Sequence, residues 1–484
     1  MIDLSDLAES VPVRVTNQRQ TRFRAAAINS QNVAEGDLFF ALRGESRDGH
    51  EFAIDAARAG AAGVVVEKDV EGLPPELTVV KVPDTLTALQ SAGAAVRRRT
   101  RASVIAVTGS AGKTTTKDMV ACVLAAQFDV HSSKSSFNNH LGVPLTLLGV
   151  QPGHTHVVTE IGTNHRGEVS SLARIVEPDV GLVTNVGYAH IGNFRDRAEL
   201  AEEKTDLLRQ VRTGGTWIVN GDDVLLVDTV SRLPNTATVV TVGFGDHCAL
   251  RATDVSFDEA GTTGAIVTEE GHNVPFALSA SGKPFVYAAL FALAVGRVHG
   301  IDVTTGTDAL RGFTAPYGRA NIIRLPSGLL VVDDSYNASP DATLAALELL
   351  GAMPASVRIA VIGEMRELGT ETANLHRTVG QSAASAATHL VVVGDDAKSL
   401  LEGAHERGLP FERTWCAGSA LEAYEIVEAI AEPIGSDVAV LVKGSRFTHM
   451  ERVPLGLSGK SVSCPLGVCQ LYINCGTCPK LEMI

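Results

Sequence analysis

The sequence has no run of eighteen consecutive apolar residues, which is about the length that a membrane-spanning helix requires. Its first ten residues, MIDLSDLAES, have neither the basic start nor the apolar core of a secretory signal peptide. Basic residues are outnumbered, 41 against 55 acidic ones, and the formal net charge is −14. Because binding a nucleic-acid backbone needs clustered Lys and Arg, the composition argues against a nucleic-acid partner. We therefore expect a cytoplasmic protein that binds neither membrane nor nucleic acid.

Cysteine is scarce over most of the chain and concentrated at its end. Three cysteines are isolated, at positions 122, 248 and 416. The other four, spaced C-x4-C-x5-C-x2-C, are Cys464, Cys469, Cys475 and Cys478. Thiolates suit a tetrahedral zinc site, but this spacing matches no paired zinc-binding pattern, and an exposed tail without catalytic importance fits it as well. The status of residues 458–484 stays open.

The length of 484 residues and an apolar fraction of 45% predict about three globular domains. Short apolar runs such as VIAVTG, VGLVTNVG, RIAVIGEM and VAVLVKGS each end in glycine or polar residues and precede a helical pattern. This alternation is typical of α/β domains with mostly parallel sheets. We expect a small α/β domain over residues 1–101, a central domain over 102–314 and a doubly wound, Rossmann-like domain over 315–457.

The segment VIAVTGSAGKTTTKDMV, residues 104–120, predicts a phosphate-binding loop between a strand and a helix. Its glycines let the backbone approach phosphate oxygens, and the helix start offers free N–H groups. Lys113 would contact the β- and γ-phosphates and Thr114 would bind Mg²⁺, although Val107 stands where the full P-loop pattern has its first glycine. The expected nucleotide-binding residues are Gly109, Ser110, Ala111, Gly112, Lys113, Thr114 and Thr115.

The loop by itself leaves the phosphate chemistry open. A GTPase would need the guanine-specific tetrapeptide N-K-x-D, which the sequence does not contain. A small-molecule kinase remains compatible with the loop.

Further segments, in chain order, resemble the Mur ligases of bacterial cell-wall synthesis. They are VTGSAGKTTTKDM, SSFNNHLGVPLTLL, TEIGTNHRGEVSSL, TNVGYAHIGNF, ELAEEKTDLL, VVDDSYNASPDATLAAL, VIGEMRELG and VLVKGSR. The first domain is similar to the UDP-sugar-binding domain of this family over residues 22–67. The segment at 135–148 looks most like the branch of the family that adds D-alanyl-D-alanine.

The resemblance implies an ATP-dependent, ADP-forming amide ligase. It would join D-alanyl-D-alanine to UDP-N-acetylmuramoyl-tripeptide for peptidoglycan synthesis, acting as a monomer. The γ-phosphoryl group is first moved onto a carboxylate, and the incoming amine then displaces phosphate from the acyl phosphate. Two Mg²⁺ ions and a lysine would neutralise the charge that gathers at this site.

The resemblance also implies roles for individual residues. The expected catalytic residues are Lys113, Glu160, His190 and Lys204, and the expected metal ligands are Thr114, Glu160, His190 and Lys204. The matching family lysine is typically carbamylated by CO₂, and the sequence leaves open whether Lys204 is modified. Two residues of the third domain, Arg319 and Asp334, would contact the nucleotide. The expected substrate-binding residues are Ser30, Gly44, Asp48, His50, Asn138, Asn139, Asn337 and Ser339.

Two departures from the family pattern leave the base contacts open. Asn29 and Gln31 replace an acid and a base near the expected uracil site, and Lys283 and Tyr287 replace a His and an Asn near the expected adenine site. The alternatives are another Mur-type amide ligase, of the diamino-acid-adding or folylpolyglutamate-synthase kind, and a non-catalytic nucleotide-binding scaffold. The third residue of the accepted peptide is also open.

Overall fold

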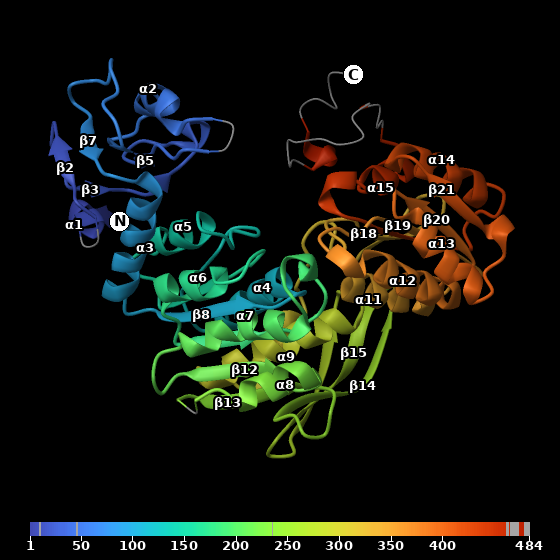
Figure 1. Cartoon of the computed structure of the whole chain (residues 1–484). Helices are drawn as coiled ribbons and strands as arrows, with labels where there is room; N and C mark the ends of the chain where they lie inside the picture. The colour runs from blue at the N-terminus through green and yellow to red at the C-terminus, as the bar shows by residue number, and fades with distance from the viewer. Residues whose placement is uncertain (9–10, 45–46, 235, 461–463, 465–473, 479–484) are drawn as a thin grey trace.

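The computed structural model describes residues 1–8, 11–44, 47–234, 236–460, 464 and 474–478. These residues form three α/β domains, each built on its own sheet and following one another from left to right in Figure 1. The predicted fold class is therefore confirmed. Cys469 and most of the tail at 458–484 lie outside the described residues. Among the helices described, none has the length and apolar character needed to span a membrane.

The first domain is a small sheet with helices packed around it. Its elements are β1 (Ile2–Asp3), α1 (Leu4–Ala8), β2 (Arg14–Thr16), β3 (Arg22–Phe23), β4 (Ala26–Ala27), η1 (Ser30–Asn32), β5 (Leu38–Phe40), η2 (Gly49–Phe52), α2 (Ala53–Arg58), β6 (Gly63–Val66), β7 (Thr78–Lys81) and α3 (Thr85–Arg99). The main sheet has the order β2-β7-β6-β5-β4, parallel except at its β2 edge. The side chain of Asp84 accepts a hydrogen bond from Thr87 N and so caps α3. One apolar cluster continues from α3 into the central domain, which joins the two domains.

The central domain is a mostly parallel sheet with an antiparallel extension. Its elements are β8 (Ser103–Thr108), α4 (Lys113–Leu124), β9 (Val130–Ser132), α5 (Gly142–Leu148), β10 (His156–Glu160), α6 (Glu168–Val176), β11 (Val180–Val183), η3 (Ile191–Asn193), α7 (Arg197–Arg209), β12 (Thr216–Asn220), α8 (Val224–Ser231), β13 (Thr238–Gly243), β14 (Leu250–Asp258), β15 (Gly261–Thr268), β16 (Asn273–Leu278), α9 (Lys283–Val298) and α10 (Val303–Leu310). The strand order is β16-β15-β14-β13-β12-β11-β8-β10-β9. The strands from β9 to β13 are parallel and were predicted in part, whereas the hairpins of β14, β15 and β16 were not.

Buried apolar residues hold the phosphate-loop strand in place. Val104, Ile105, Ala106 and Val107 are all fully buried, because helices cover both faces of β8. The apolar helix α9 packs against α4 on one of these faces. The loop after β8 therefore starts from a rigid base.

The third domain is doubly wound. Its elements are β17 (Asn321–Arg324), β18 (Leu330–Asp334), α11 (Pro340–Ala352), β19 (Val357–Gly363), η4 (Gly369–Glu371), α12 (Thr372–Ala386), β20 (His389–Val393), α13 (Ala397–Glu406), η5 (Phe411–Arg413), β21 (Thr414–Ala417), α14 (Ala420–Ala431), β22 (Val438–Lys443), η6 (Arg446–Thr448), α15 (Arg452–Leu457) and η7 (Cys475–Thr477). The order β17-β18-β22-β19-β20-β21 is parallel except for β17. β22 lies between β18 and β19 and pairs with both, so the order of the strands in the sheet departs there from their order in the chain. In doubly wound domains, ligands bind at the point where the strand order reverses.

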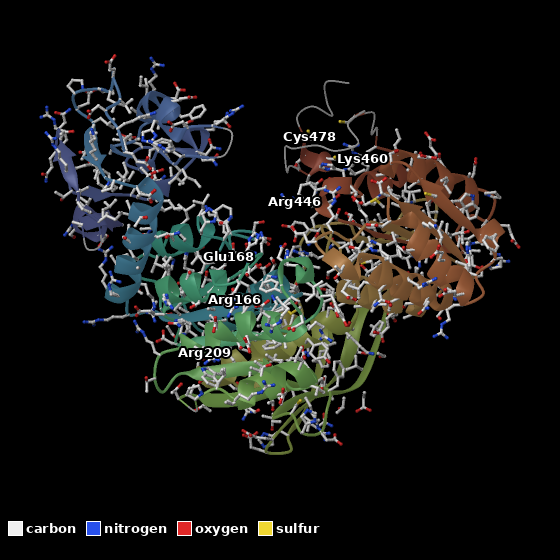
Figure 2. All side chains as sticks on the ribbon, viewed as in Figure 1. Arg166, Glu168, Arg209, Arg446, Lys460 and Cys478 are labelled. Atoms are coloured by element: carbon white, nitrogen blue, oxygen red, sulfur yellow. The ribbon has the colours of Figure 1, made fainter. Side chains whose placement is uncertain are left out.

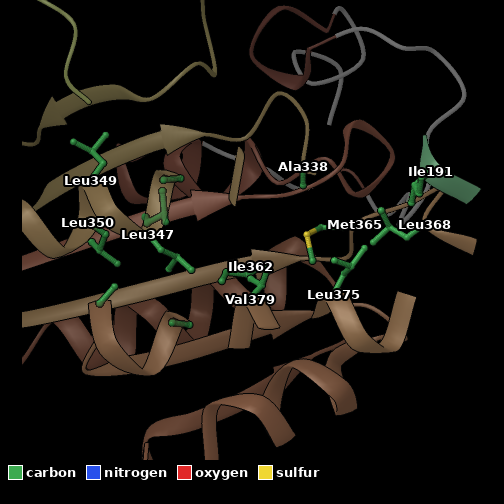
Figure 3. Close-up of a cluster of buried hydrophobic side chains, with 14 of the residues drawn as sticks. Ile191, Ala338, Leu347, Leu349, Leu350, Ile362, Met365, Leu368, Leu375 and Val379 are labelled. Atoms are coloured by element: carbon green, nitrogen blue, oxygen red, sulfur yellow. The ribbon is translucent and has the colours of Figure 1, made fainter. Parts of the chain in front are cut away.

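The third domain packs against the central domain through a shared apolar cluster. Ile191 of η3 belongs to the same buried cluster as Met365 and Leu368 (Figure 3). The backbone N–H of Gly192 donates to the carbonyl oxygen of Glu367 at 2.8 Å. The structure therefore has the two domains in contact. The predicted domain boundaries stay predictions.

Candidate active site

The phosphate loop lies between β8 and α4, and its glycines have the backbone angles that its shape requires. Gly109 and Gly112 have φ of 145° and 80°, values that other residues rarely adopt. A Cβ atom on Gly109 would lie 1.9 Å from Oγ1 of Thr184. Glycine is therefore needed at position 109 for space as well as for conformation.

Asn185, which sequence reasoning did not select, holds this loop from the end of the neighbouring strand β11. Its carbonyl oxygen accepts from Ser110 N at 3.0 Å, and its Oδ1 accepts from Ala111 N at 2.9 Å. Thr184 Oγ1 donates to the carbonyl oxygen of Ala111 at 2.6 Å. The signal for Asn185 was its position after a predicted parallel strand, at the same sheet edge as the loop.

Three predicted residues meet at the start of α4. Thr114 Oγ1 donates to Glu160 Oε2 at 2.8 Å, and Asn138 Nδ2 donates to Glu160 Oε1 at 2.7 Å. Glu160 is 1% exposed and Thr114 is 8% exposed. A buried carboxylate beside a hydroxyl is the hard oxygen environment that suits Mg²⁺.

Lys113 and Lys204 lie near this group, and burial affects both amines. Burial lowers the pKa of Lys113, an effect that Glu160 opposes and Arg319 of the third domain reinforces. Lys113 Nζ donates to the carbonyl oxygen of Gly109 at 2.9 Å. Lys204, on α7, is 1% exposed; burial and the nearby charge of Lys113 lower its pKa well below the usual lysine range. Burial and the charge of Lys113 therefore both disfavour the protonated form of Lys204.

His190, an expected metal ligand, contacts a carboxylate of the third domain. Its Nδ1 contacts the carboxylate of Glu367, from the third domain, and the hydrogen bond lowers the pKa of Glu367. His190 also has a left-handed backbone, with φ of 64°. The pairing of His190 with Glu367, a residue that sequence reasoning did not select, joins the central and third domains.

A cavity of about 420 Å³ lies between the phosphate loop and the third domain. The predicted residues that line it are Ser110, Ala111, Gly112, Thr115, Arg319, Asp334, Asn337 and Ser339. The guanidinium of Arg319 lies 4.1 Å above the ring of Tyr336, and Tyr336 OH is 3.0 Å from Ser136 Oγ of the central domain. The structure thus brings the phosphate loop and the two predicted third-domain nucleotide contacts to one cavity.

Asp334 is held by a buried lysine. Lys443 Nζ lies 2.5 Å from Asp334 Oδ2, and Ala320 N donates to Asp334 Oδ1 at 3.1 Å. Lys443 is 3% exposed, and burial lowers its pKa while Asp334 opposes that change. Lys443 therefore orients the carboxylate that lines the cavity.

Lys283 and Tyr287, which depart from the family pattern near the expected adenine site, also line the cavity. Tyr287 OH donates to Asp222 Oδ2 at 2.7 Å, and its ring meets Phe244 edge to face. Lys283 forms an ion pair with Glu348 at 2.6 Å. Tyr287 is therefore oriented by its hydroxyl, with its ring as part of the cavity wall.

The predicted substrate residues of the first domain lie apart from this cavity. Asp48 accepts from Lys68 Nζ at 2.7 Å, a bond that lowers the pKa of Asp48, and it also contacts His50 Nδ1 at 2.5 Å. His50 is 3% exposed and its Nε2 accepts from Glu67 N. Both ring nitrogens of His50 therefore have partners within this domain.

The remaining predicted residues have local backbone roles. Ser30 begins η1, which Asn29 caps, and Gly44 N donates to the carbonyl oxygen of Arg47. Asn139 Oδ1 accepts from the backbone N–H groups of Leu141 and Gly142 at the start of α5.

Comparisons with known proteins agree with this arrangement of domains. Family models described as "Mur ligase family, catalytic domain", "Mur ligase middle domain" and "Mur ligase, glutamate ligase domain" match residues 23–130, 107–296 and 318–446. The chain is 32% identical to the UDP-N-acetylmuramoyl-tripeptide--D-alanyl-D-alanine ligase of Bacillus subtilis, with 93% of this chain and 97% of that protein covered. This chain belongs to the Mur ligase family.

Solved structures of Mur ligases extend the comparison to three dimensions. A crystal structure of MurF from Acinetobacter baumannii superposes with a TM-score of 0.85 at 28% identity, covering 95% of this chain and 99% of that one. MurF from Thermotoga maritima in complex with ADP superposes with a TM-score of 0.78 at 25% identity, covering 90% and 97%. The whole three-domain Mur ligase architecture is therefore present here.

Proposed function

We propose that this Mur ligase joins D-alanyl-D-alanine to UDP-N-acetylmuramoyl-tripeptide, cleaving ATP to ADP and phosphate, in peptidoglycan precursor synthesis. This chain is similar over more than nine-tenths of its length to a UDP-N-acetylmuramoyl-tripeptide--D-alanyl-D-alanine ligase and to a MurF structure, which supports these substrates. The observation that carries the chemistry is the contact of Thr114 with Glu160 next to Lys113. The neighbouring loop residues Gly112 and Thr115 line a cavity together with Arg319 of the third domain. Such a site concentrates positive charge where phosphate groups would lie.

The residues around Glu160 fit a magnesium ion. Thr114 and Glu160 supply adjacent buried oxygen atoms, and Asn138 orients the carboxylate. When bound, Mg²⁺ would neutralise charge on the β- and γ-phosphates of ATP. We propose that Thr114 and Glu160 hold one ion and that His190 and Lys204 serve a second.

For Lys204 we propose a carbamate. Only a neutral amine attacks CO₂, and burial of Lys204 beside Lys113 favours the neutral form. The nitrogen lone pair bonds to the carbon of CO₂ and one proton leaves the nitrogen, so a neutral amine becomes an anion. The positive charge of Lys113, which disfavours a protonated Lys204, would attract the negatively charged carbamate.

Within this chain, Lys113 and Arg319 would stabilise the negative charge as the peptide carboxylate attacks the γ-phosphorus and ADP leaves. The amine of D-alanyl-D-alanine then attacks the acyl carbon, loses a proton, and phosphate departs. The third domain contacts the central one where Gly192 N donates to the carbonyl oxygen of Glu367. Closure of the two domains around ATP would exclude water that hydrolyses the acyl phosphate.

We further propose a division of labour among the domains. Residues 1–101 would bind the UDP-sugar through Ser30, Gly44, Asp48 and His50, residues 102–314 would bind ATP, and residues 315–457 would bring the nucleotide contacts and, through Asn337 and Ser339, part of the dipeptide site. Asn139 would approach the peptide near Asn138. We expect a monomer that works in the cytoplasm, where its nucleotide substrates are.

Phosphate release tests the substrates directly. The full chain, Mg²⁺, ATP and UDP-N-acetylmuramoyl-tripeptide are combined with D-alanyl-D-alanine, with a diamino acid, or with folate and glutamate in place of the peptide pair. We expect release with the dipeptide alone. Release with a diamino acid, or with folate and glutamate, would move the protein to another branch of the family, and no release in any mixture would favour a nucleotide-binding scaffold.

A further inference from the structure

Three side chains with metal-binding atoms converge at the end of the third domain, away from the phosphate loop. They are His449, Glu451 and Cys475, all buried. His449 Nδ1 lies 3.0 Å from Glu451 Oε1 and 3.5 Å from Cys475 Sγ. The ligand atoms all lie within 4.8 Å of one another. His449 and Glu451 lie between η6 and α15, whereas Cys475 begins η7 in the cysteine-rich tail.

The spacing of these atoms suits a tetrahedral zinc ion. Bonds of about 2.0–2.3 Å to nitrogen, oxygen and sulfur place neighbouring ligand atoms of a tetrahedron about 3.3–3.8 Å apart. The 3.5 Å distance from His449 Nδ1 to Cys475 Sγ lies within that range, and the 3.0 Å distance to Glu451 Oε1 is about 0.3 Å shorter. A set of one thiolate, one imidazole and one carboxylate is chemically suited to Zn²⁺ and leaves the fourth position to water.

Neighbouring groups hold the ligands in place. Cys475 N donates to Glu451 Oε1 at 3.2 Å, which uses one lone pair of that oxygen and leaves another for a metal. Arg452 Nε donates to Cys475 Sγ at 3.4 Å, and Arg452 Nη1 donates to the carbonyl oxygen of Cys464 at 3.5 Å. These hydrogen bonds fix the position of Cys475 next to Glu451.

A second group of the same residue types provides a contrast. Asp222, His247 and Cys248 also bring their ligand atoms within 4.8 Å of one another. The carboxylate of Asp222, however, already accepts from the backbone N–H groups of Phe244 and Gly245 and from Tyr287 OH. Burial and the nearby Asp222 raise the pKa of the Cys248 thiol to about 11, so that it stays protonated. This second group therefore forms a hydrogen-bonded structural network. Its cysteine, Cys248, serves as a control for the metal-binding experiments.

We propose that His449, Glu451 and Cys475 form a zinc site that pins the cysteine-rich tail to the third domain. Binding would replace the proton of the Cys475 thiol and any proton on His449 Nδ1 by the metal. Cys478 lies at the same end of the third domain as Arg446 and Lys460 (Figure 2). Next to Cys475, Asn474 bonds to Tyr317, two residues before Arg319. The metal would thus hold Cys475 and its neighbours beside the loop that carries Arg319, a residue that lines the cavity.

The site can be tested by titrating the purified, chelator-treated full chain with Co²⁺ under reducing conditions. We expect one equivalent to bind with a thiolate-to-cobalt charge-transfer absorption, which Zn²⁺ displaces. Cys475→Ser should abolish the absorption, and His449→Gln should weaken Co²⁺ binding at least tenfold. The matched control, Cys248→Ser, should leave both unchanged. Absence of the absorption in the unmodified chain, or its persistence in Cys475→Ser, would overturn the proposal.

A second measurement needs no variant. Cysteine alkylation followed by peptide mapping of the unmodified chain should show that Zn²⁺ slows modification of Cys475 at least tenfold. The exposed Cys416 should react equally with and without the metal. Equal protection of both cysteines, or of neither, would contradict a zinc site at Cys475.

Discussion

Replacing Thr114 by valine tests the centre of the proposed site, because valine keeps the shape of threonine and has a methyl group in place of the hydroxyl. The Thr114–Glu160 hydrogen bond is 2.8 Å long and buried at both ends. A hydrogen bond to a charged group contributes about 1.5–3 kcal/mol to stability. For a domain of this size each kcal/mol lowers the melting temperature by about 2–4 °C, so we expect a fall of roughly 3–12 °C. If the hydroxyl also binds Mg²⁺, turnover should fall by about 100-fold or more, the scale of one lost transition-state-stabilising group.

Thr159→Val is the matched control. Thr159 precedes Glu160 on the same strand, is fully buried, and its Oγ1 has no hydrogen-bond partner within the described part of the chain. Replacing such a hydroxyl by a methyl group should leave the melting temperature unchanged or raise it, with normal turnover. The measurements are thermal unfolding without nucleotide and phosphate release at saturating ATP and Mg²⁺. Equal turnover in the two variants would refute the metal-ligand role of Thr114.

Three further predictions concern lysines of the site and a buried acid. Lys113→Ala should abolish phosphate release while binding of the UDP-substrate, measured by calorimetry, stays nearly unchanged; equal loss of both would contradict separate sites. Turnover should fall in CO₂-free buffer and recover with bicarbonate, and the mass of the peptide that contains Lys204 should rise by one CO₂. If turnover does not depend on CO₂, a required carbamate is excluded. Burial raises the pKa of Asp333 to about 6. The folded chain therefore binds the extra proton between about pH 4 and 6, and its stability falls as pH rises through that window. Asp333→Asn should remove that fall and stabilise the protein at pH 7 by about 2–3 kcal/mol, as measured by chemical unfolding; an unchanged pH profile would contradict this.

The strands of all three domains were largely predictable, because each is a short apolar run that ends in glycine or polar residues. The hairpins β14, β15 and β16 were missed. Their exposed and partly buried residues alternate, so they lack the continuous apolar runs of the parallel strands. Thr114 and Glu160, both expected metal ligands, are in contact, and Asn138, expected to bind substrate, donates to the same carboxylate.

Other features of the site depend on partners far away in sequence. Glu367 meets His190 across 177 positions, and Lys443 of β22 meets Asp334 at the paired position of the neighbouring strand β18. The metal roles of His190 and Lys204 stay predictions.

The sequence alone determined the phosphate loop, because its glycines, lysine and hydroxyl act through local backbone geometry that a few adjacent residues encode. It also determined the order of the motifs along the chain. Only the tertiary structure decided that Lys204 is buried beside Lys113, that Asn185 braces the loop, and that the tail reaches His449. The pKa of a side chain and its hydrogen-bond partners depend on the charged and buried residues around it. Those residues come together only when the chain folds.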